Sequence, residues 1–256
     1  MSHPNGLLAW ADVALPDIAK GAAFYGNLLG WETQEVEGSH GTYHFFMKGG
    51  RKAAGVGLLS EDDVANGIPP VWSSYVAVDD VDAIAARAPE LGGSVMVPPM
   101  DVMDAGRMSF ITDPTGAMLG FWQAGVHEGA DLFNEPGFMS WNELATTDVD
   151  AAVSFYTQLC GWGAEAQEQD GGWVYTVFTL DGNPNGGTYD MAAFWPEGIP
   201  PHWGVYFAVS DTDAVAARAA ELGGTVAGGP IDSPNGRLAN LIDDQGAAFT
   251  VITLPG

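Results

Sequence analysis

Two short apolar segments each carry a tryptophan and a carboxylate two residues apart, Trp10 with Asp12 and Trp141 with Glu143. Side chains two apart in a strand point to the same side, so each segment presents an indole ring and a carboxylate on one face. The ring could stack on a planar ligand. The carboxylate, its pKa raised by a dry aromatic surrounding, could act as a general acid or base. Asp12 and Glu143 are therefore candidate catalytic residues.

Further candidates for ligand binding accompany these carboxylates: Trp10, Trp141, Tyr75, Tyr206, Arg107, Arg237 and His202. A phenol or a guanidinium could stabilise an oxyanion. Structural alternatives stay open, because the tryptophans could simply fill an interior and the arginines could pair with Asp113 and Asp243. A histidine beside a proline, as at position 202, is most often a surface residue.

The candidates come in pairs because the chain is a tandem repeat. Gly6–Trp10 matches Gly137–Trp141 at an offset of 131 residues, and the same offset relates the long segments that begin at Pro69 and Pro200. Chance does not produce such a collinear set of matches. We predict a first domain at 1–123, a linker at 124–136 and a second domain at 137–256.

Within each copy, the pattern predicts one strand, one helix and three strands, twice over. In the first copy, Asp17 is expected to cap a helix that ends at Leu29, and Gly92 is expected to stop a helix over Asp79–Leu91. The matching helices of the second copy are expected at 148–160 and 211–222. The strands of the first copy are expected near 7–15, 31–37, 42–48, 53–59, 72–78, 94–97, 107–112 and 117–123.

These motifs resemble the vicinal-oxygen-chelate superfamily, which includes glyoxalases, bleomycin-resistance proteins and extradiol dioxygenases. The resemblance rests on Asp17…Phe24-Tyr25…Leu29-Gly30-Trp31, on its repeat at 148–162, and on the turn Asp113–Gly116, from which Asp243–Gly246 departs. It implies an α+β fold of four βαβββ units that form two tandem glyoxalase-like domains with incomplete β-barrels. It also implies that Tyr75 and Tyr206 face the barrel interiors, where ligands sit. The sequence leaves open whether each cavity lies within a copy or between copies.

The resemblance further implies four metal-ligand positions in each copy, which many relatives fill with His and Glu. Here these positions hold Trp10 and Trp141, Ser73 and Gly204, Gly120 and Thr250, and, near the fourth, Gly55 and Asp190. Indole and glycine side chains do not ligate a divalent ion. We therefore expect no metal and no other cofactor. A residual site built from His202, Glu143 and Asp190 stays open as the alternative.

The composition of the chain limits which binding partners and which cellular compartment we expect. The formal net charge is -25 with only eight Lys and Arg residues, which disfavours nucleic acid and anionic membranes as partners. A single cysteine, Cys160, excludes an intrachain disulfide and is expected to be a buried hydrophobe. His127, in the linker, is expected to be solvated. With no leader peptide and no membrane span, we expect a cytoplasmic monomer or homodimer that binds a small organic molecule.

Three functions remain in view. The first is binding of an aromatic or hydrophobic natural product in metal-free barrels, as in resistance or sequestration. The second is a metal-free isomerase or cyclase of natural-product metabolism that uses a barrel carboxylate. The third, a metal-dependent glyoxalase-type lyase, requires the residual site to be real. Divergence between the copies favours a single functional cavity.

Overall fold

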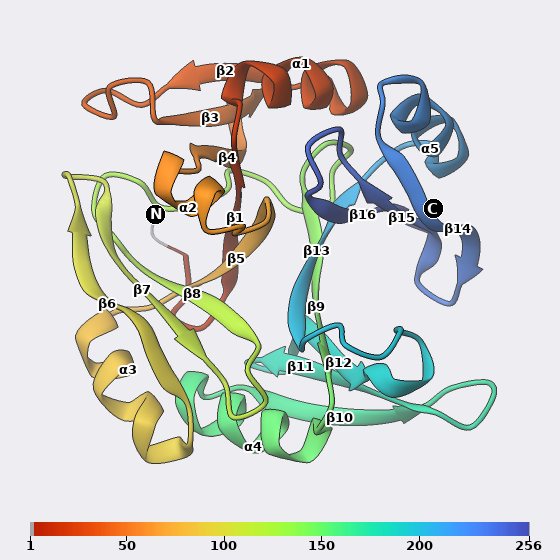
Figure 1. The fold of residues 1–256 in the computed structure, drawn as a ribbon. Coiled ribbons are helices and arrows are strands. Elements are labelled where there is room, and N and C mark those ends of the chain that lie inside the picture. Colours follow the sequence, from red (N-terminus) through yellow and green to blue (C-terminus); the bar gives the residue numbers. More distant parts are fainter. Residues whose placement is uncertain (1–2, 256) are drawn as a thin grey trace. The chain divides into compact units, whose positions relative to one another are not determined.

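The computed structural model describes residues 3–255, which form two eight-stranded sheets with helices (Figure 1). The first sheet has the strand order β2-β3-β4-β1-β5-β8-β7-β6, and the second has β10-β11-β12-β9-β13-β16-β15-β14. The second order repeats the first with every label raised by eight, so the duplication seen in the sequence is a duplication of fold. Neither sheet closes into a barrel, and the predicted α+β class is confirmed.

The elements of the first copy follow the predicted order of strand, helix and three strands, twice over. Its strands are β1 (Leu8–Leu15), β2 (Glu32–Glu35), β3 (Tyr43–Lys48), β4 (Arg51–Leu58), β5 (Val71–Ala77), β6 (Ser94–Val102), β7 (Gly106–Thr112) and β8 (Met118–Ala124). Its helices are α1 (Ile18–Leu29), α2 (Glu61–Ala65), α3 (Val81–Arg87) and the 3-10 turn η1 (Ala88–Leu91).

The second copy repeats this order. Its strands are β9 (Met139–Thr146), β10 (Gly163–Glu168), β11 (Val174–Leu180), β12 (Asn183–Asp190), β13 (His202–Ala208), β14 (Thr225–Ser233), β15 (Gly236–Ile242) and β16 (Ala248–Thr253). Its helices are α4 (Val149–Cys160), the 3-10 turn η2 (Met191–Ala193) and α5 (Thr212–Glu221). None of the helices in residues 3–255 is long and apolar enough to span a membrane.

Local chemistry fixes the ends of the long helices. Asp17 accepts the Lys20 backbone N–H at 2.9 Å, and Gly30 ends α1 in the left-handed conformation at φ 72°. This is the preferred pairing of a polar N-cap with a C-terminal glycine. The predicted Asp79–Leu91 helix is found as α3 over Val81–Arg87, and its last four residues form the 3-10 turn η1, because Pro89 cannot donate to the α-helical ladder.

The chain packs as two compact units that do not follow the boundary of the repeat. Unit 1 comprises Met1–Trp10, Ser74–Gly129 and Asn142–Gly204, and unit 2 comprises Ala11–Ser73, Ala130–Trp141 and Val205–Gly256. Each unit therefore combines one half of the first copy with one half of the second. Strands β1, β5, β9 and β13 contribute residues to both units.

Unit 2 is held together by a buried hydrogen-bonded triad that joins the two copies. The Tyr25 hydroxyl on α1 donates to Asp243 Oδ2 at 2.9 Å, and the Trp72 indole N–H donates to the same hydroxyl at 2.9 Å. Burial raises the pKa of the Tyr25 hydroxyl well above its usual value, and the Asp243 charge raises it further. The phenol therefore stays protonated and serves as a permanent donor to the carboxylate.

Unit 1 repeats the arrangement with the roles of the copies exchanged. The Trp203 indole donates to the Tyr156 hydroxyl at 2.9 Å. Burial, and then the charge of Asp113, raise the pKa of Tyr156. Trp162 is buried, and its indole N–H donates to the carbonyl of Gly6 at 2.7 Å. Each core thus takes a helix from one copy and a turn from the other.

Replacing Tyr25 with Phe tests this junction. The change leaves Asp243 Oδ2 and the Trp72 N–H buried without their partner, so we expect the free energy of unfolding to fall by about 1–3 kcal/mol. Urea denaturation measures it. The exposed Val126 supplies the control, since Val126→Ala should change stability by less than about 0.5 kcal/mol. Equal midpoints for Tyr25→Phe and the unchanged protein would contradict this role for the phenol.

Candidate functional site

Strand register shows which residues share a face with the candidate carboxylates. Asp12 on β1 pairs with Gly55 on β4, and Glu143 on β9 pairs with Gly187 on β12. Directly paired residues in a sheet present their side chains on the same face. The faces concerned are those opposite α1 and α4, because the alternate residues of the same strands, such as Val13 and Leu144, lie in the cores that include helix residues.

Each glycine at these positions is covered by a tyrosine ring. In unit 2, Tyr43 lies over Gly55 and its hydroxyl donates to Asp12 Oδ2 at 2.9 Å. In unit 1, Tyr175 lies over Gly187 in the same way. A Cβ at either glycine would overlap the hydroxyl of its tyrosine. The close approach of the ring therefore requires glycine.

A third tyrosine repeats the pattern within unit 1. Tyr75 on β5 pairs with Gly120 on β8, and its ring lies where a Cβ at Gly120 would be. Tyr75 is buried and packs against Phe110 at a ring-centroid distance of 5.2 Å. A side chain long enough to bind a metal at Gly120 would have to displace this ring.

The donors at the implied metal positions do not fit a divalent ion. No group of three or more His, Cys, Asp and Glu side chains within residues 3–255 is placed to hold one. The register places Gly187 opposite Glu143, as it places Gly55 opposite Asp12, and Asp190 lies three residues further along β12. Asp190 instead caps η2 by accepting the Ala192 N–H at 2.9 Å. His202 Nδ1 lies 2.9 Å from the Pro200 carbonyl.

The second copy instead gathers aromatic side chains around Tyr189, which lies on the same strand face as Glu143. Five rings form what we call the aromatic face, and they come from the residue before β11, from β11 and β12, and from the segment that follows β12: Trp173, Tyr175, Tyr189, Phe194 and Trp195. Ring-centroid distances are 5.0 Å for Trp173–Phe194 and 5.5 Å for Tyr189–Phe194. These separations are typical of favourable edge-to-face contacts.

Tyr189 connects the rings to the carboxylate. Its hydroxyl accepts the Trp195 indole N–H at 2.8 Å, which fixes the orientation of both rings. Burial raises the pKa of Tyr189 to about 12, and the negative charge of Glu143 contributes to the rise. The phenol is therefore a neutral donor at physiological pH, close to a carboxylate that can accept.

The first copy does not offer the same surface. Gly57 occupies the place of Tyr189, two residues after the glycine that pairs with the carboxylate. On the face that carries Asp12, the strand positions matching Tyr175 and Tyr189 therefore hold one tyrosine, Tyr43, and one glycine. Sequence analysis had not singled out Trp173, Tyr189, Phe194 or Trp195 as candidate site residues. The tyrosine two residues after Gly187 was the available signal.

The remaining aromatic candidates differ in how far they are buried. Trp10 is buried in unit 1 and packs edge-on against His127 at 4.5 Å. The expectation that His127 is solvated was therefore wrong, since its ring is buried against Trp10 and Trp122. Trp141 and Tyr206 are half-buried.

The two arginines are structural ties with partners that the sequence did not indicate. Arg107 binds Asp82 and Asp101 at 2.8 Å each, and Arg237 binds Asp213 and Asp232. The turn carboxylates Asp113 and Asp243 are instead occupied by backbone N–H groups of their own turns. Both guanidinium groups thus fasten a helix to a strand and do not extend the aromatic face.

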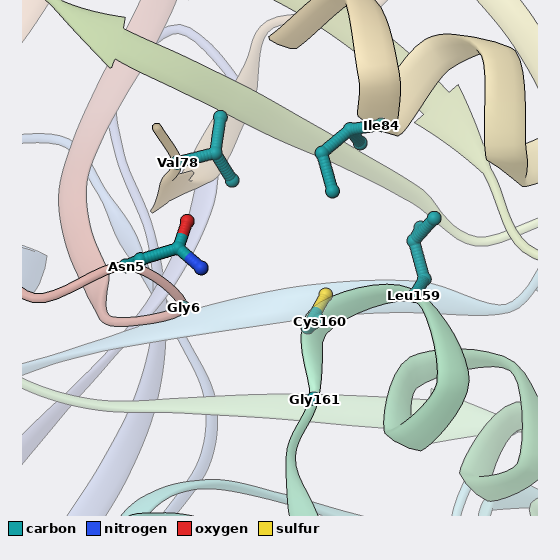
Figure 2. Close-up of a pocket in the computed structure, with 7 residues that line it drawn as sticks. All are labelled: Asn5, Gly6, Val78, Ile84, Leu159, Cys160 and Gly161. Carbon is teal, nitrogen blue, oxygen red and sulfur yellow. The ribbon is translucent and has the colours of Figure 1, made fainter. Parts of the chain in front are cut away.

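A separate small pocket of about 190 Å³ lies in unit 1 (Figure 2). None of the predicted site residues lines it. Burial raises the pKa of the Cys160 thiol at its wall, so this thiol stays protonated and the predicted inert, buried cysteine is confirmed. The lining residues are Asn5, Gly6, Val78, Ile84, Leu159, Cys160 and Gly161.

Comparison with known families and proteins agrees with this architecture. The family model of the Glyoxalase/Bleomycin resistance protein/Dioxygenase superfamily matches residues 7–121 and again 139–249. "Putative glyoxylase CFP32" of Mycobacterium tuberculosis is 43% identical, with 98% of this chain and 95% of that protein covered. The anthracycline biosynthesis protein DnrV of Streptomyces peucetius is 38% identical, with coverage of 97% and 94%.

Solved structures support the fold alone. The manganese-bound glyoxalase of Novosphingobium aromaticivorans has a TM-score of 0.64 at 18% identity, covering 98% of this chain and 83% of that one. The 2,3-dioxygenase LapB of a Pseudomonas strain has a TM-score of 0.64 at 14% identity, covering 97% and 93%.

Gly120→Ala tests whether a tyrosine has taken the space of a metal ligand. The new methyl group would overlap the Tyr75 ring, so we expect a loss of about 1–3 kcal/mol in the free energy of unfolding. Gly57→Ala is the matched control, because its Cβ would approach Tyr43 no closer than 3.4 Å. If both variants unfold at the same denaturant concentration, the ring does not fill that position.

Proposed function

Since the chain belongs to the Glyoxalase/Bleomycin resistance protein/Dioxygenase superfamily, we propose that it binds a planar aromatic small molecule, without a metal, on the aromatic face of its second copy. One observation carries the proposal. Five aromatic rings pack together in the second copy, and one of them, Tyr189, lies on the same strand face as Glu143 and the tyrosine-covered Gly187. Rings held by one another and by the Trp195–Tyr189 hydrogen bond form a preorganised stacking surface.

The names of two relatives support this choice of ligand. DnrV and DauV, at 38% and 37% identity, are called anthracycline biosynthesis proteins. Anthracyclines contain a flat system of fused rings, which is the shape that aromatic side chains stack on. A ligand of this kind suits Trp173 and Phe194, of which Phe194 is 53% exposed.

A metal-free isomerase or cyclase is the second candidate. It is favoured by the pairing of carboxylate and phenol, in which Asp12 accepts from Tyr43 at 2.9 Å and Glu143 lies near the neutral Tyr189. Such a pair could move a proton to or from a bound ring system. A metal-dependent lyase is not proposed, because the donor set does not fit an ion.

Trp173→Ala tests the binding function. With 1,8-dihydroxyanthraquinone as the probe, we expect calorimetry to show an affinity about 2- to 12-fold weaker in the variant, the worth of one stacking contact. The exposed neighbour Val174 supplies the control, and Val174→Ala should leave the affinity unchanged. The probe should be recovered chemically intact after incubation.

Two results would count against this function. If the Trp173→Ala variant and the unchanged protein bind the probe with equal affinity, the aromatic face is not the binding surface. Conversion of a natural-product ligand to a new compound, abolished by Glu143→Gln, would replace binding with the isomerase or cyclase.

A further inference from the structure

The segment of the second copy that carries the aromatic face is strongly acidic and contains no lysine or arginine. Residues 142–204 include nine Asp and Glu residues, and no Lys or Arg occurs between Arg107 and Arg218. Fixed charge of one sign raises the local concentration of ligands of the opposite sign. This segment therefore favours a cationic ligand over an anionic one.

The rings themselves add attraction for a cation. The face of an aromatic ring carries partial negative charge, and a cation within about 6 Å of the ring centroid is stabilised by it. Trp173 lies 6.2 Å from Tyr189 and 5.0 Å from Phe194, so a ligand at this cluster contacts several rings together. Glu143 pairs with Gly187 on β12, and Tyr189 lies two residues further along the same face of that strand. The negative charge of Glu143 contributes to the raised pKa of the Tyr189 hydroxyl.

We propose that the ligand of the aromatic face is an organic cation, namely a planar aromatic molecule that carries a protonated or quaternary amine. The rings contact the ammonium group and the aromatic system, and the Glu143 carboxylate neutralises the positive charge. This inference rests on the proposed binding function and adds the charge of the ligand to it.

The first copy is not expected to bind the same cation. Its strand β4 has Gly57 where β12 has Tyr189, so a ring is missing from the corresponding face. Cation binding is therefore a property of the second copy, and one site is expected per chain.

Two isosteric probes test the charge of the ligand. Calorimetry on the full chain would compare (1-naphthylmethyl)trimethylammonium with its neutral analogue, in which a tert-butyl group replaces the trimethylammonium group. We expect the cation to bind about tenfold more tightly than the analogue. Raising the salt concentration should lower the affinity for the cation and leave the affinity for the neutral analogue unchanged.

Two variants complete the test. Glu143→Gln should reduce the preference for the cation several-fold while the affinity for the neutral analogue is retained. Glu168→Gln removes the same charge from an exposed position on β10, paired with Val174, and should leave the preference intact. The retained binding of the neutral analogue also shows that the Glu143 variant is folded.

The outcomes separate this inference from the proposed function. Equal binding of both probes would overturn the inference that the ligand is a cation, and the aromatic face would remain a binding surface. A preference that survives Glu143→Gln would overturn the role of that carboxylate. Failure of both probes to bind would overturn the proposed function, and the inference with it.

Discussion

The fold depends on buried hydrogen bonds and contacts that connect a helix of one copy to a turn of the other. Tyr25 donates to Asp243 Oδ2, while Asp243 Oδ1 accepts the backbone N–H groups of residues 245–247. One carboxylate therefore shapes its own turn and binds the helix of the other copy. A buried carboxylate without such partners would be costly, so the tyrosine and the aspartate constrain each other.

This constraint explains why the two copies form one molecule. Each compact unit contains half of either copy, so neither half of the sequence holds a complete core by itself. The residues that form the cores are closely matched between the copies, as in Tyr25 and Tyr156 or Trp72 and Trp203. The opposite strand faces carry no such constraint, and there the copies differ.

On those strand faces, matching positions of the two copies carry side chains of different size and polarity. Gly57 in the first copy corresponds to Tyr189 in the second, and Gly120 corresponds to Thr250, whose hydroxyl donates to Asn240 Oδ1 at 2.8 Å. A tyrosine over a glycine fills the place where a metal-binding side chain would begin. Such exchanges keep the strands and change what the face can bind.

The fold was largely predictable from the sequence because its signals are local. Asp17 and Gly30 mark the ends of α1 directly. The partners of Arg107 were not predictable, since Asp82 approaches it only once α3 has packed on the sheet. The short helix α2, capped by Ser60, was missed although its Ser-Glu-Asp-Asp start is a capping pattern.

The aromatic face was predictable only in part. Trp173 and Trp195 stand out in the sequence, but their contact with Tyr189 depends on a strand register that one inserted residue shifts between the copies. That shift concealed the correspondence of Gly187 with Gly55.

The metal content of the purified chain, measured by elemental mass spectrometry without chelators during purification, tests the central claim most directly. We expect only trace amounts of zinc, nickel, iron or manganese, because glycines covered by tyrosines stand where metal ligands would be needed. A full equivalent of any of these metals per chain would contradict it. Such a result would return the protein to the metal-dependent chemistry that the donor set argues against.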